Sequence, residues 1–369
     1  TMPGMSLALE SPALAFSLHP ASGQWQAHDR VGPGALSGRL GLRYRAGNKA
    51  ARWSGAFSRP DPQSFELTTP QGRLSGLQLA QELPGGLLLV AEFAAPPDLP
   101  FLLWRLTAHN RGNGLLWLDR FDLLQAGQAQ PGAFPADLAF YSNGWQSWSY
   151  SGALGARDRQ PRSRLGPITG PLRRNPTTPQ PLRPGHFVSD MFGVLADRRG
   201  KTGVLAGFLS QTRQFGTVET DLTCLPCALS MWAAGDGALL PPGAEMATDW
   251  AVLQFLDLDQ QESPTGDSHP LGPYLQSAGR ESGARVPAST PVGWCSWYHF
   301  YNRVTEADML SNLQAVQRGR DDLPLTLFQL DDGYQADVGD WFERSPAFPH
   351  DLRALTAQIC AADLTPGVW

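Results

Sequence analysis

The sequence predicts a chain of two parts, a β-sandwich over residues 1–285 followed by an α/β region over residues 286–369. Short apolar runs separated by Pro, Gly and Asn clusters fill the first part, and no helical pattern of useful length interrupts them. After residue 285, strand and helix patterns alternate. A length of 369 residues also exceeds what one ordinary core accommodates, which favours two domains.

Strand patterns recur throughout the first part. Between Leu102 and His109 the residues alternate with a period of two, and Val204–Leu209 is another short apolar run. Turn-forming clusters such as Arg111–Gly114 separate these runs. A segment this long indicates a large, many-stranded sandwich. We interpret Arg157–Pro184, rich in Arg, Pro and Gly, as a surface loop and Gln261–Pro273 as a linker.

The second part follows the order strand, helix, strand, helix, strand. Strands are expected over Pro291–Tyr298, Leu323–Leu330 and Thr365–Trp369. A capping-box-like start at Thr305 and an apolar face that begins at Leu352 mark the two helices between them. Parallel strands with crossover helices form either a doubly wound sheet or a TIM barrel. A barrel needs eight strands, so it would require more chain than is present here.

Composition and charge exclude several classes of partner. The net charge is −5 with no basic patch, so nucleic acid is not expected. No run is apolar enough to span a bilayer and no signal peptide is visible, so we expect a cytoplasmic protein without a membrane partner. Cys224 and Cys227 have a metal-like spacing, but no second pair accompanies them, and we expect neither a metal nor an organic cofactor. A homo-oligomer remains possible.

The sharpest local signal is the pair Asp331 and Asp332, followed by Gly333. The pair lies at the carboxyl end of a buried strand, and in α/β folds that end faces the ligand. Asp and Gly are also common in turns, so the pair taken alone is as readily a turn as a site.

Two aromatic clusters accompany this pair. Gly293–Tyr301 carries five aromatic residues around the end of the first expected strand of the α/β region. Tyr141–Tyr150 in the sandwich has too many polar residues to be buried over its whole length, and too many aromatic residues for a loop without a role. Aromatic rings suit the C–H face of a sugar, and carboxylates suit its hydroxyls.

These motifs together resemble the melibiase-type α-galactosidases of glycoside hydrolase family 36. Five runs carry the resemblance, in this order: Asn143–Trp148, Gly293–Tyr298, Gln329–Tyr334, Gly339–Trp341 and Pro366–Trp369. The resemblance implies an N-terminal β-supersandwich followed by the first three β/α units of a TIM (β/α)8 barrel. It also implies retaining hydrolysis of terminal α-galactosides such as melibiose or raffinose.

The resemblance also implies roles for individual residues. Asp331 and Asp332 match the acidic pair that hydrogen-bonds the 4- and 6-hydroxyls of galactose. The aromatic residues expected to line the galactose pocket are Trp297, Tyr298 and Trp369. A Trp of the sandwich, Trp145 or Trp148, would match one that reaches over the pocket. Trp341 is a further candidate, because it lies in a loop after the second strand of the α/β region and a loop over a barrel mouth can touch sugar.

The catalytic carboxylates of such an enzyme are not expected in this chain. In the family the nucleophile follows strand four and the acid/base follows strand six, and this chain reaches strand three. Asp331 and Asp332 are unsuited to that role, because retaining glycosidases hold their two carboxyl groups about 5–5.5 Å apart across the scissile bond. Adjacent residues at a strand end do not easily straddle a bond in that way, so we assign the pair to substrate binding.

Two other hypotheses stay open at this point. The first is a related enzyme, either a galactosyltransferase like raffinose or stachyose synthase or an α-N-acetylgalactosaminidase. The second is a non-catalytic carbohydrate-binding protein. In each case the expected partner is a small carbohydrate.

Overall fold

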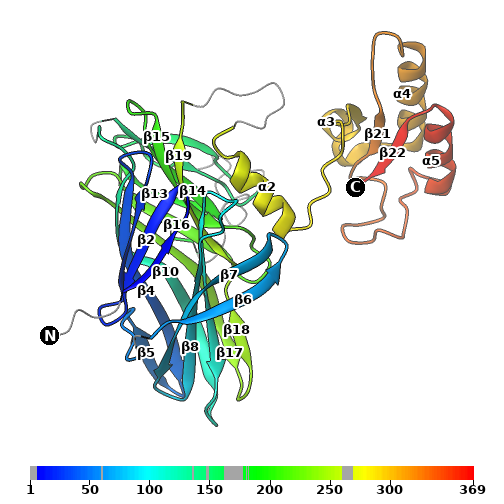
Figure 1. The fold of residues 1–369 in the computed structure, drawn as a ribbon. Coiled ribbons are helices and arrows are strands. Elements are labelled where there is room, and N and C mark those ends of the chain that lie inside the picture. The colour runs from blue at the N-terminus through cyan, green and yellow to red at the C-terminus, as the bar shows by residue number, and fades with distance from the viewer. Residues whose placement is uncertain are drawn as a thin grey trace. The chain divides into compact units, whose positions relative to one another are not determined.

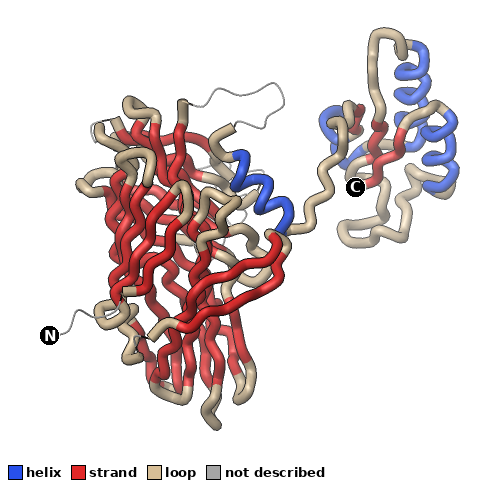
Figure 2. The backbone as a smooth tube through the Cα atoms, viewed as in Figure 1, coloured by secondary structure: helices blue, strands red, loops and turns tan. Residues whose placement is uncertain are grey.

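A computed structural model describes residues 6–59, 61–134, 137–146, 149–161, 178–179, 181, 183–259 and 269–369. The chain divides into two compact units, Thr1–Ala284 and Arg285–Trp369, each described below by itself (Figure 1). Strands make up most of the first unit, and helices are prominent in the second (Figure 2).

The larger unit is built from two antiparallel sheets. Over the described residues, the first sheet has nine strands, in the order β1 (Leu7–Glu10), β2 (Leu14–His19), β3 (Gln24–Asp29), β4 (Ala35–Ala46), β10 (Leu116–Gln130), β17 (Cys227–Leu240), β16 (Gly216–Asp221) and β13 (His186–Asp190), with β5 (Lys49–Trp53) paired to β4. The second, ten-stranded within the same residues, has the order β12 (Gly152–Gly155), β11 (Leu138–Ser142), β14 (Phe192–Asp197), β15 (Thr202–Phe208), β19 (Ala251–Asp257), β9 (Leu102–Asn110), β8 (Leu87–Ala94), β7 (Gly72–Leu83) and β6 (Gln63–Thr69), with β18 (Glu245–Ala247) on β9.

The two sheets enclose one shared core. Successive side chains of a strand point to opposite faces, so each sheet contributes one face to this core. In β9, Leu102, Trp104 and Leu106 are fully buried in it. Trp104 meets Trp25 of β3 at a tilt of 61°, with ring centroids 5.9 Å apart. The β-sandwich predicted from the sequence is therefore confirmed, and both of its sheets are antiparallel.

A helix covers part of the outer face of the ten-stranded sheet. This helix, α2 (Gly272–Glu281), begins with Pro273 in its first turn. The Tyr274 side chain is buried, and its hydroxyl donates to the carbonyl of Phe208 at 2.8 Å. The expectation of no helix before residue 285 was wrong, because few residues of α2 are buried and its apolar pattern is correspondingly weak. Residues 261–268 of the expected linker, and residues 162–177, 180 and 182 of the expected loop at Arg157–Pro184, lie outside the described part of the chain.

The smaller unit contains a parallel sheet in the order β20 (Gly293–Cys295), β21 (Leu327–Leu330) and β22 (Thr365–Val368). Helix α4 (Glu306–Arg318) joins β20 to β21, and α5 (Leu352–Ala361) joins β21 to β22. Thr305 closes the expected capping box, in which its side chain and that of Asp308 each accept from the other's backbone N–H. The predicted β-α-β-α-β order is confirmed over these residues.

All three strands of this unit are shorter than expected, and the first differs most in where it ends. The first strand ends at Cys295, and the chain then turns into the short helix α3 (Trp297–Phe300) and the 3-10 turn η2 (Tyr301–Arg303). The backbone of Ser296 is already helical, with φ −68° and ψ −27°, which stops the strand there. Trp297 and Tyr298 therefore lie on a helical turn after the strand. No helix in the described part of the chain is long and apolar enough to cross a membrane.

Candidate functional site

The register of the parallel sheet brings the ends of its three strands together. Cys295 pairs with Gln329, and Leu330 pairs with Val368. The next residues along the chain are Ser296, Asp331 and Trp369. The Asp331 N–H donates to Ser296 Oγ at 2.9 Å, and the Trp369 N–H donates to the Leu330 carbonyl at 3.0 Å. All of these groups therefore lie at the carboxyl edge of the sheet, where parallel sheets bind ligands.

Asp331 is held by hydrogen bonds from its neighbours. Its Oδ2 accepts from Gln329 Nε2 at 2.9 Å and from Cys295 Sγ at 3.3 Å. Its Oδ1 accepts from the Asp332 N–H at 2.9 Å. Burial, and then the hydrogen bond to Asp331 and its negative charge, raise the pKa of the Cys295 thiol. The thiol therefore stays protonated and able to donate at neutral pH.

Asp332 is held on one side only. Gln335 Nε2 donates to Asp332 Oδ1, and Gln335 Oε1 accepts from the Gly333 N–H at 3.0 Å. Gln335 is only 7% exposed, so this contact is fixed by packing. Within the described residues, Oδ2 of Asp332 accepts no hydrogen bond. Asp332 as a whole is half-exposed, so this oriented oxygen can accept a hydrogen bond from a hydroxyl of a ligand.

Gly333 fixes the direction of the turn after Asp332. Its φ is +114°, which L side chains rarely adopt. A Cβ at this position would lie 2.7 Å from the carbonyl oxygen of Asn302, so the turn after β21 packs directly on η2. Glycine is therefore required both by the backbone angle and by the close approach.

A hollow of about 320 Å³ opens beside this turn, and its lining includes Asp332, Asn302, Arg303 and Val338. Tyr334 stands at the other side of the turn and donates its hydroxyl to the Trp369 carbonyl at 3.3 Å. Burial, and next the charge of Asp332, raise the pKa of Tyr334. Its hydroxyl therefore stays protonated and can keep this hydrogen bond, which joins the turn after β21 to the end of β22.

The aromatic candidates divide into two groups. Trp341 and Trp369 meet edge-to-face, with ring centroids 5.6 Å apart and an angle of 72°, so both stand at the carboxyl edge. Trp297 is half-buried and meets Tyr301 at 5.4 Å. Tyr298 is 84% exposed, and no ring contact or hydrogen bond of its side chain joins it to another described residue.

The sandwich candidates belong to the larger unit. Trp145 is half-buried and meets Phe215 edge-on, with ring centroids 6.0 Å apart. Trp148 lies outside the described residues. A contact of Trp145 or Trp148 with sugar therefore stays a prediction.

Sequence reasoning missed the residues that hold the acidic pair. The sequence motifs include Gln329 and Cys295 without giving either a role, and Gln335 lies outside them. The alternation of side chains along a strand could have revealed Gln329, because residues two apart, such as Gln329 and Asp331, lie on the same face. Gln335 gives no comparable signal, since its side chain reaches Asp332 through a turn.

A metal site gains no support from the described residues. No group of three or more His, Cys, Asp and Glu side chains among them is placed to hold a metal ion. Cys224 is exposed and Cys227 is buried. Burial, with the nearby charges of Cys224 and Asp221, raises the pKa of Cys227 to about 12, so its thiolate is disfavoured.

No protein-family model matches the chain. Solved structures share its fold. The α-galactosidase of Lactobacillus brevis matches 99% of this chain and 54% of its own, at a TM-score of 0.60 and 14% identity. A variant of the family 36 α-galactosidase AgaA of Geobacillus stearothermophilus, in complex with 1-deoxygalactonojirimycin, matches 99% of this chain and 56% of its own, at a TM-score of 0.58 and 13% identity.

The fold is not confined to one glycosidase family. A glycoside hydrolase family 97 enzyme variant of a Pseudoalteromonas strain matches 97% of this chain and 53% of its own, at a TM-score of 0.55 and 10% identity. At these identities the likeness shows the fold alone. The chain spans about half the length of the solved structures that it matches.

Proposed function

We propose that this chain is the front portion of a retaining α-galactosidase that hydrolyses terminal non-reducing α-galactosides of the melibiose or raffinose type. The observation that carries the proposal is the meeting of Asp331, Asp332 and Trp369 at the carboxyl edge of the parallel sheet. Acidic groups beside an aromatic ring suit the hydroxyls and the C–H face of one sugar. The order of the five sequence motifs supports galactose as that sugar.

In this proposal the two carboxylates have different tasks. Asp332 offers its open Oδ2 to a galactose hydroxyl. Both oxygens of Asp331 already accept protein hydrogen bonds, so a sugar hydroxyl must use the lone pairs that remain. Charge-assisted bonds of this kind can select the axial 4-hydroxyl of galactose over the equatorial one of glucose.

The proposal places the smaller unit at the start of a TIM barrel. Within the described residues, β20 and β22 each pair with β21 alone, so each leaves one edge unpaired. Closing a barrel would supply both missing neighbours. The nucleophile and the acid/base would come from later strands, and the reaction would pass through a galactosyl–Asp intermediate that water releases. Neither a metal nor an organic cofactor is needed.

Substitution of Asp332 in the enzyme produced from the complete reading frame tests the proposal. Asp332→Asn is expected to lower kcat/KM for melibiose or an aryl α-galactoside by about 10- to 100-fold, because hydrogen bonds to charged groups contribute about 1.5–3 kcal/mol. It should also reduce the preference for α-galactosides over α-glucosides. Asp322→Asn is the matched control, because Asp322 is exposed in the loop before β21, away from the carboxyl edge.

Several results would overturn this function. An enzyme that releases no galactose contradicts hydrolysis, and transfer of galactose to an added sugar acceptor indicates a galactosyltransferase. Faster cleavage of α-N-acetylgalactosaminides indicates the other related activity. Saturable binding of galactose without any turnover favours a carbohydrate-binding protein.

A further inference from the structure

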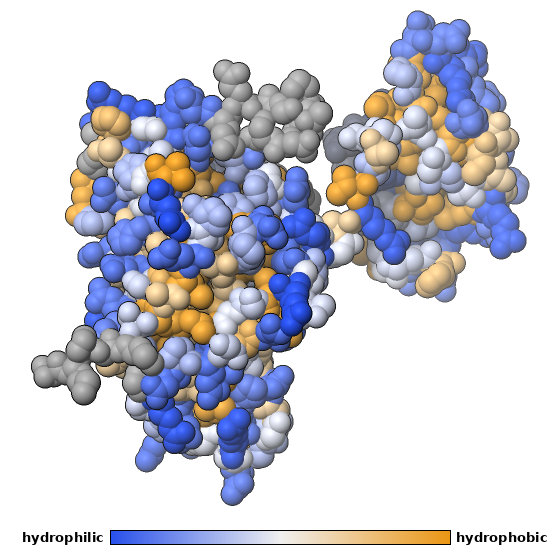
Figure 3. All heavy atoms as spheres, in the orientation of Figure 1, coloured by the Kyte–Doolittle hydropathy of each residue, from blue (hydrophilic) through white to orange (hydrophobic). Residues whose placement is uncertain are grey.

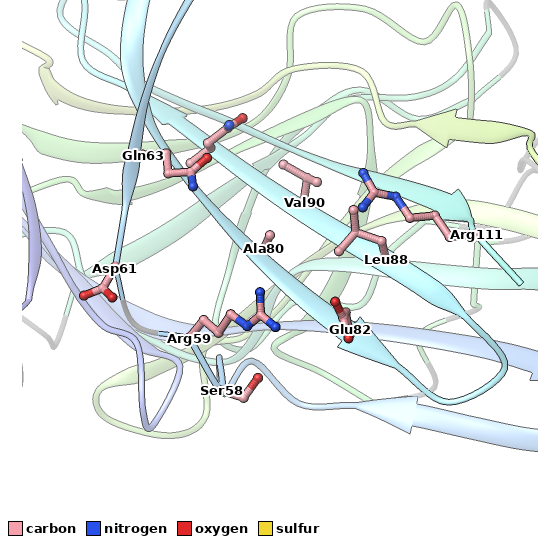
Figure 4. A pocket seen from close by; sticks show the side chains of 10 residues that line it. Ser58, Arg59, Asp61, Gln63, Ala80, Glu82, Leu88, Val90 and Arg111 are labelled. Carbon is pink, nitrogen blue, oxygen red and sulfur yellow. The ribbon is translucent and has the colours of Figure 1, made fainter.

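A second hollow, independent of the proposed sugar site, lies on the outer face of the ten-stranded sheet. It has a volume of about 620 Å³, which is within the range of about 300–1,000 Å³ typical of small-ligand sites. Its floor comes from β7 and β8, and loops before β6 and after β9 rise at its sides (Figure 4).

The sequence of β7 explains why the sheet is hollowed here. Leu79 points into the sandwich core, so Gln78, Ala80 and Glu82 point outward. Ala80 is thus a small residue between two longer ones. It pairs with Val90 of β8, which together with Leu88 completes an aliphatic floor.

Two arginine side chains reach over this floor from separate loops. Figure 4 shows the guanidinium groups of Arg59 and Arg111 on either side of Ala80 and Leu88. Neither forms an ion pair or a side-chain hydrogen bond with another described residue. Each therefore keeps its full set of donors for a ligand.

The same sheet face shows how an arginine is otherwise satisfied. Arg105 of β9 pairs through two nitrogens with Glu92, at 2.6 and 3.0 Å, and lies 4.5 Å from the ring centre of Trp250. Arg59 and Arg111 have no comparable arrangement. Both are exposed, so their donors face solvent and are open to a ligand.

Further polar side chains extend the site beyond the arginines. Gln63 of β6 pairs with Gln78 of β7, and both residues line the hollow. In Figure 4, Gln63 lies on the side away from Glu82. The amides can both donate hydrogen bonds to hydroxyls and accept them, and a carboxylate accepts them. Asp61 also lines the hollow, but its carboxylate points away from the floor in Figure 4.

We infer that this hollow binds an anionic sugar, a hydroxylated ring that carries one carboxylate or phosphate. The planar guanidinium fork of arginine matches the oxygens of such a group in two parallel hydrogen bonds. The aliphatic floor packs against the C–H face of the ring, and the amides and Glu82 form hydrogen bonds with its hydroxyls. The ligand would bind here whether or not the smaller unit takes galactose.

Calorimetric titration of the full chain with three probes tests the inference. D-Galacturonate carries the carboxylate, galactose 6-phosphate carries the phosphate, and neutral galactose carries neither. Saturable binding of galacturonate identifies a carboxylate site, and tighter binding of the phosphate identifies a phosphate site. Binding should weaken as ionic strength rises, because the groups involved are near the surface.

Matched variants locate the binding. Arg111→Gln is expected to weaken the anion's Kd by about tenfold or more. Ala80→Trp, which fills the floor from an exposed position, should abolish binding. Arg73→Gln is the control, because Arg73 lies on the same strand and already pairs with Glu66, and it should leave the Kd within about twofold.

The inference fails if neither anion binds saturably. It also fails if Ala80→Trp and Arg111→Gln leave the anion's Kd unchanged, or if Arg73→Gln weakens binding as much as Arg111→Gln does. Asp332→Asn must not change the affinity of the anion, since that result would place the binding at the carboxyl edge of the smaller unit. Circular dichroism and the Tm of each variant exclude loss of the fold as the cause.

Discussion

The two units of this chain differ in how far their aromatic rings reach the surface. In the larger unit Trp25 and Trp104 are each 1% exposed, and they contact each other across the sandwich core. In the smaller unit Phe342 is 99% exposed, Tyr298 84% and Trp369 59%. Hydrophobic side chains reach the surface of both units on the face shown in Figure 3. In the described part of the larger unit no aromatic ring is more than 40% exposed, so the degree of aromatic exposure is what separates the two units.

The exposed rings of the smaller unit also share a place in the order of the chain. They follow the carboxyl ends of its strands: Tyr298 and Tyr301 after β20, Trp341 and Phe342 after β21, and Trp369 after β22. Burial in the sandwich makes aromatic residues a source of stability, since each removes a large apolar area from water. Rings exposed after the carboxyl ends of the strands suit contact with a ligand or with another protein surface.

The largest effect is expected from a cavity in the sandwich. Trp104→Ala should lower the free energy of unfolding of the larger unit by about 3–5 kcal/mol, because a large buried ring is lost and the cavity does not fully collapse. The substitution also removes the indole N–H that donates to the Leu123 carbonyl at 3.1 Å. Urea denaturation followed by tryptophan fluorescence and circular dichroism measures the change.

Trp117→Ala is the control for residue type. Trp117 lies on the same sandwich but is only half-buried, beneath Arg45, whose guanidinium lies 5.7 Å from the ring centre. The loss of unfolding free energy in Trp117→Ala should be clearly smaller than in Trp104→Ala. Equal losses for the two substitutions would contradict the claim that burial in the shared core is what makes these rings stabilising.

A second prediction concerns the backbone of the smaller unit. Gly333→Ala should destabilise it by about 1–3 kcal/mol more than Gly339→Ala. Both glycines have positive φ, +114° and +95°, so both substitutions carry strain. Only at Gly333 would the new Cβ meet backbone, that of Asn302; at Gly339 nothing lies within 4 Å.

Thermal unfolding of both variants, with galactose titration of those that fold, measures this difference. Gly333→Ala should also weaken galactose binding if Asp332 belongs to the sugar site, because the turn that carries Asp332 must shift. The same Tm for both variants would show that the backbone of Gly333 does not pack tightly against the backbone of Asn302.

The sequence predicted the sandwich because apolar and polar residues alternate along its strands, and clusters of Pro, Gly and Asn mark the turns between them. It missed α2, in which Tyr274 is the main buried anchor and no repeating apolar face appears. It also extended the first parallel strand to Tyr298, because aromatic residues favour strands. The chain instead turns at Ser296, whose hydroxyl accepts from the Asp331 N–H, a contact 35 residues away in sequence.

The candidate site was predictable in part for a similar reason. Asp331 and Asp332 stand at a strand end, and a strand end can be recognised from a buried apolar run and the turn residues after it. Their supports cannot be recognised in that way. Gln335 acts on Asp332 through the shape of a turn, and Cys295 reaches Asp331 from the neighbouring strand, so both depend on register that a single sequence does not contain.

The smallest effect is expected where the contrast between the units is greatest. Phe342→Ala should change the stability of the smaller unit by no more than about 0.5 kcal/mol, because its ring is 99% exposed and contributes little to packing. Phe328→Ala is the matched control within the same unit, because Phe328 is fully buried and stacks on Trp294 with ring centroids 4.4 Å apart. Similar losses of Tm for the two variants would show that Phe342 packs on this unit in solution, and the exposed aromatic edge would then be part of its own core. A negligible loss, together with a raised KM for galactosides in the complete enzyme, would instead assign the ring to ligand contact.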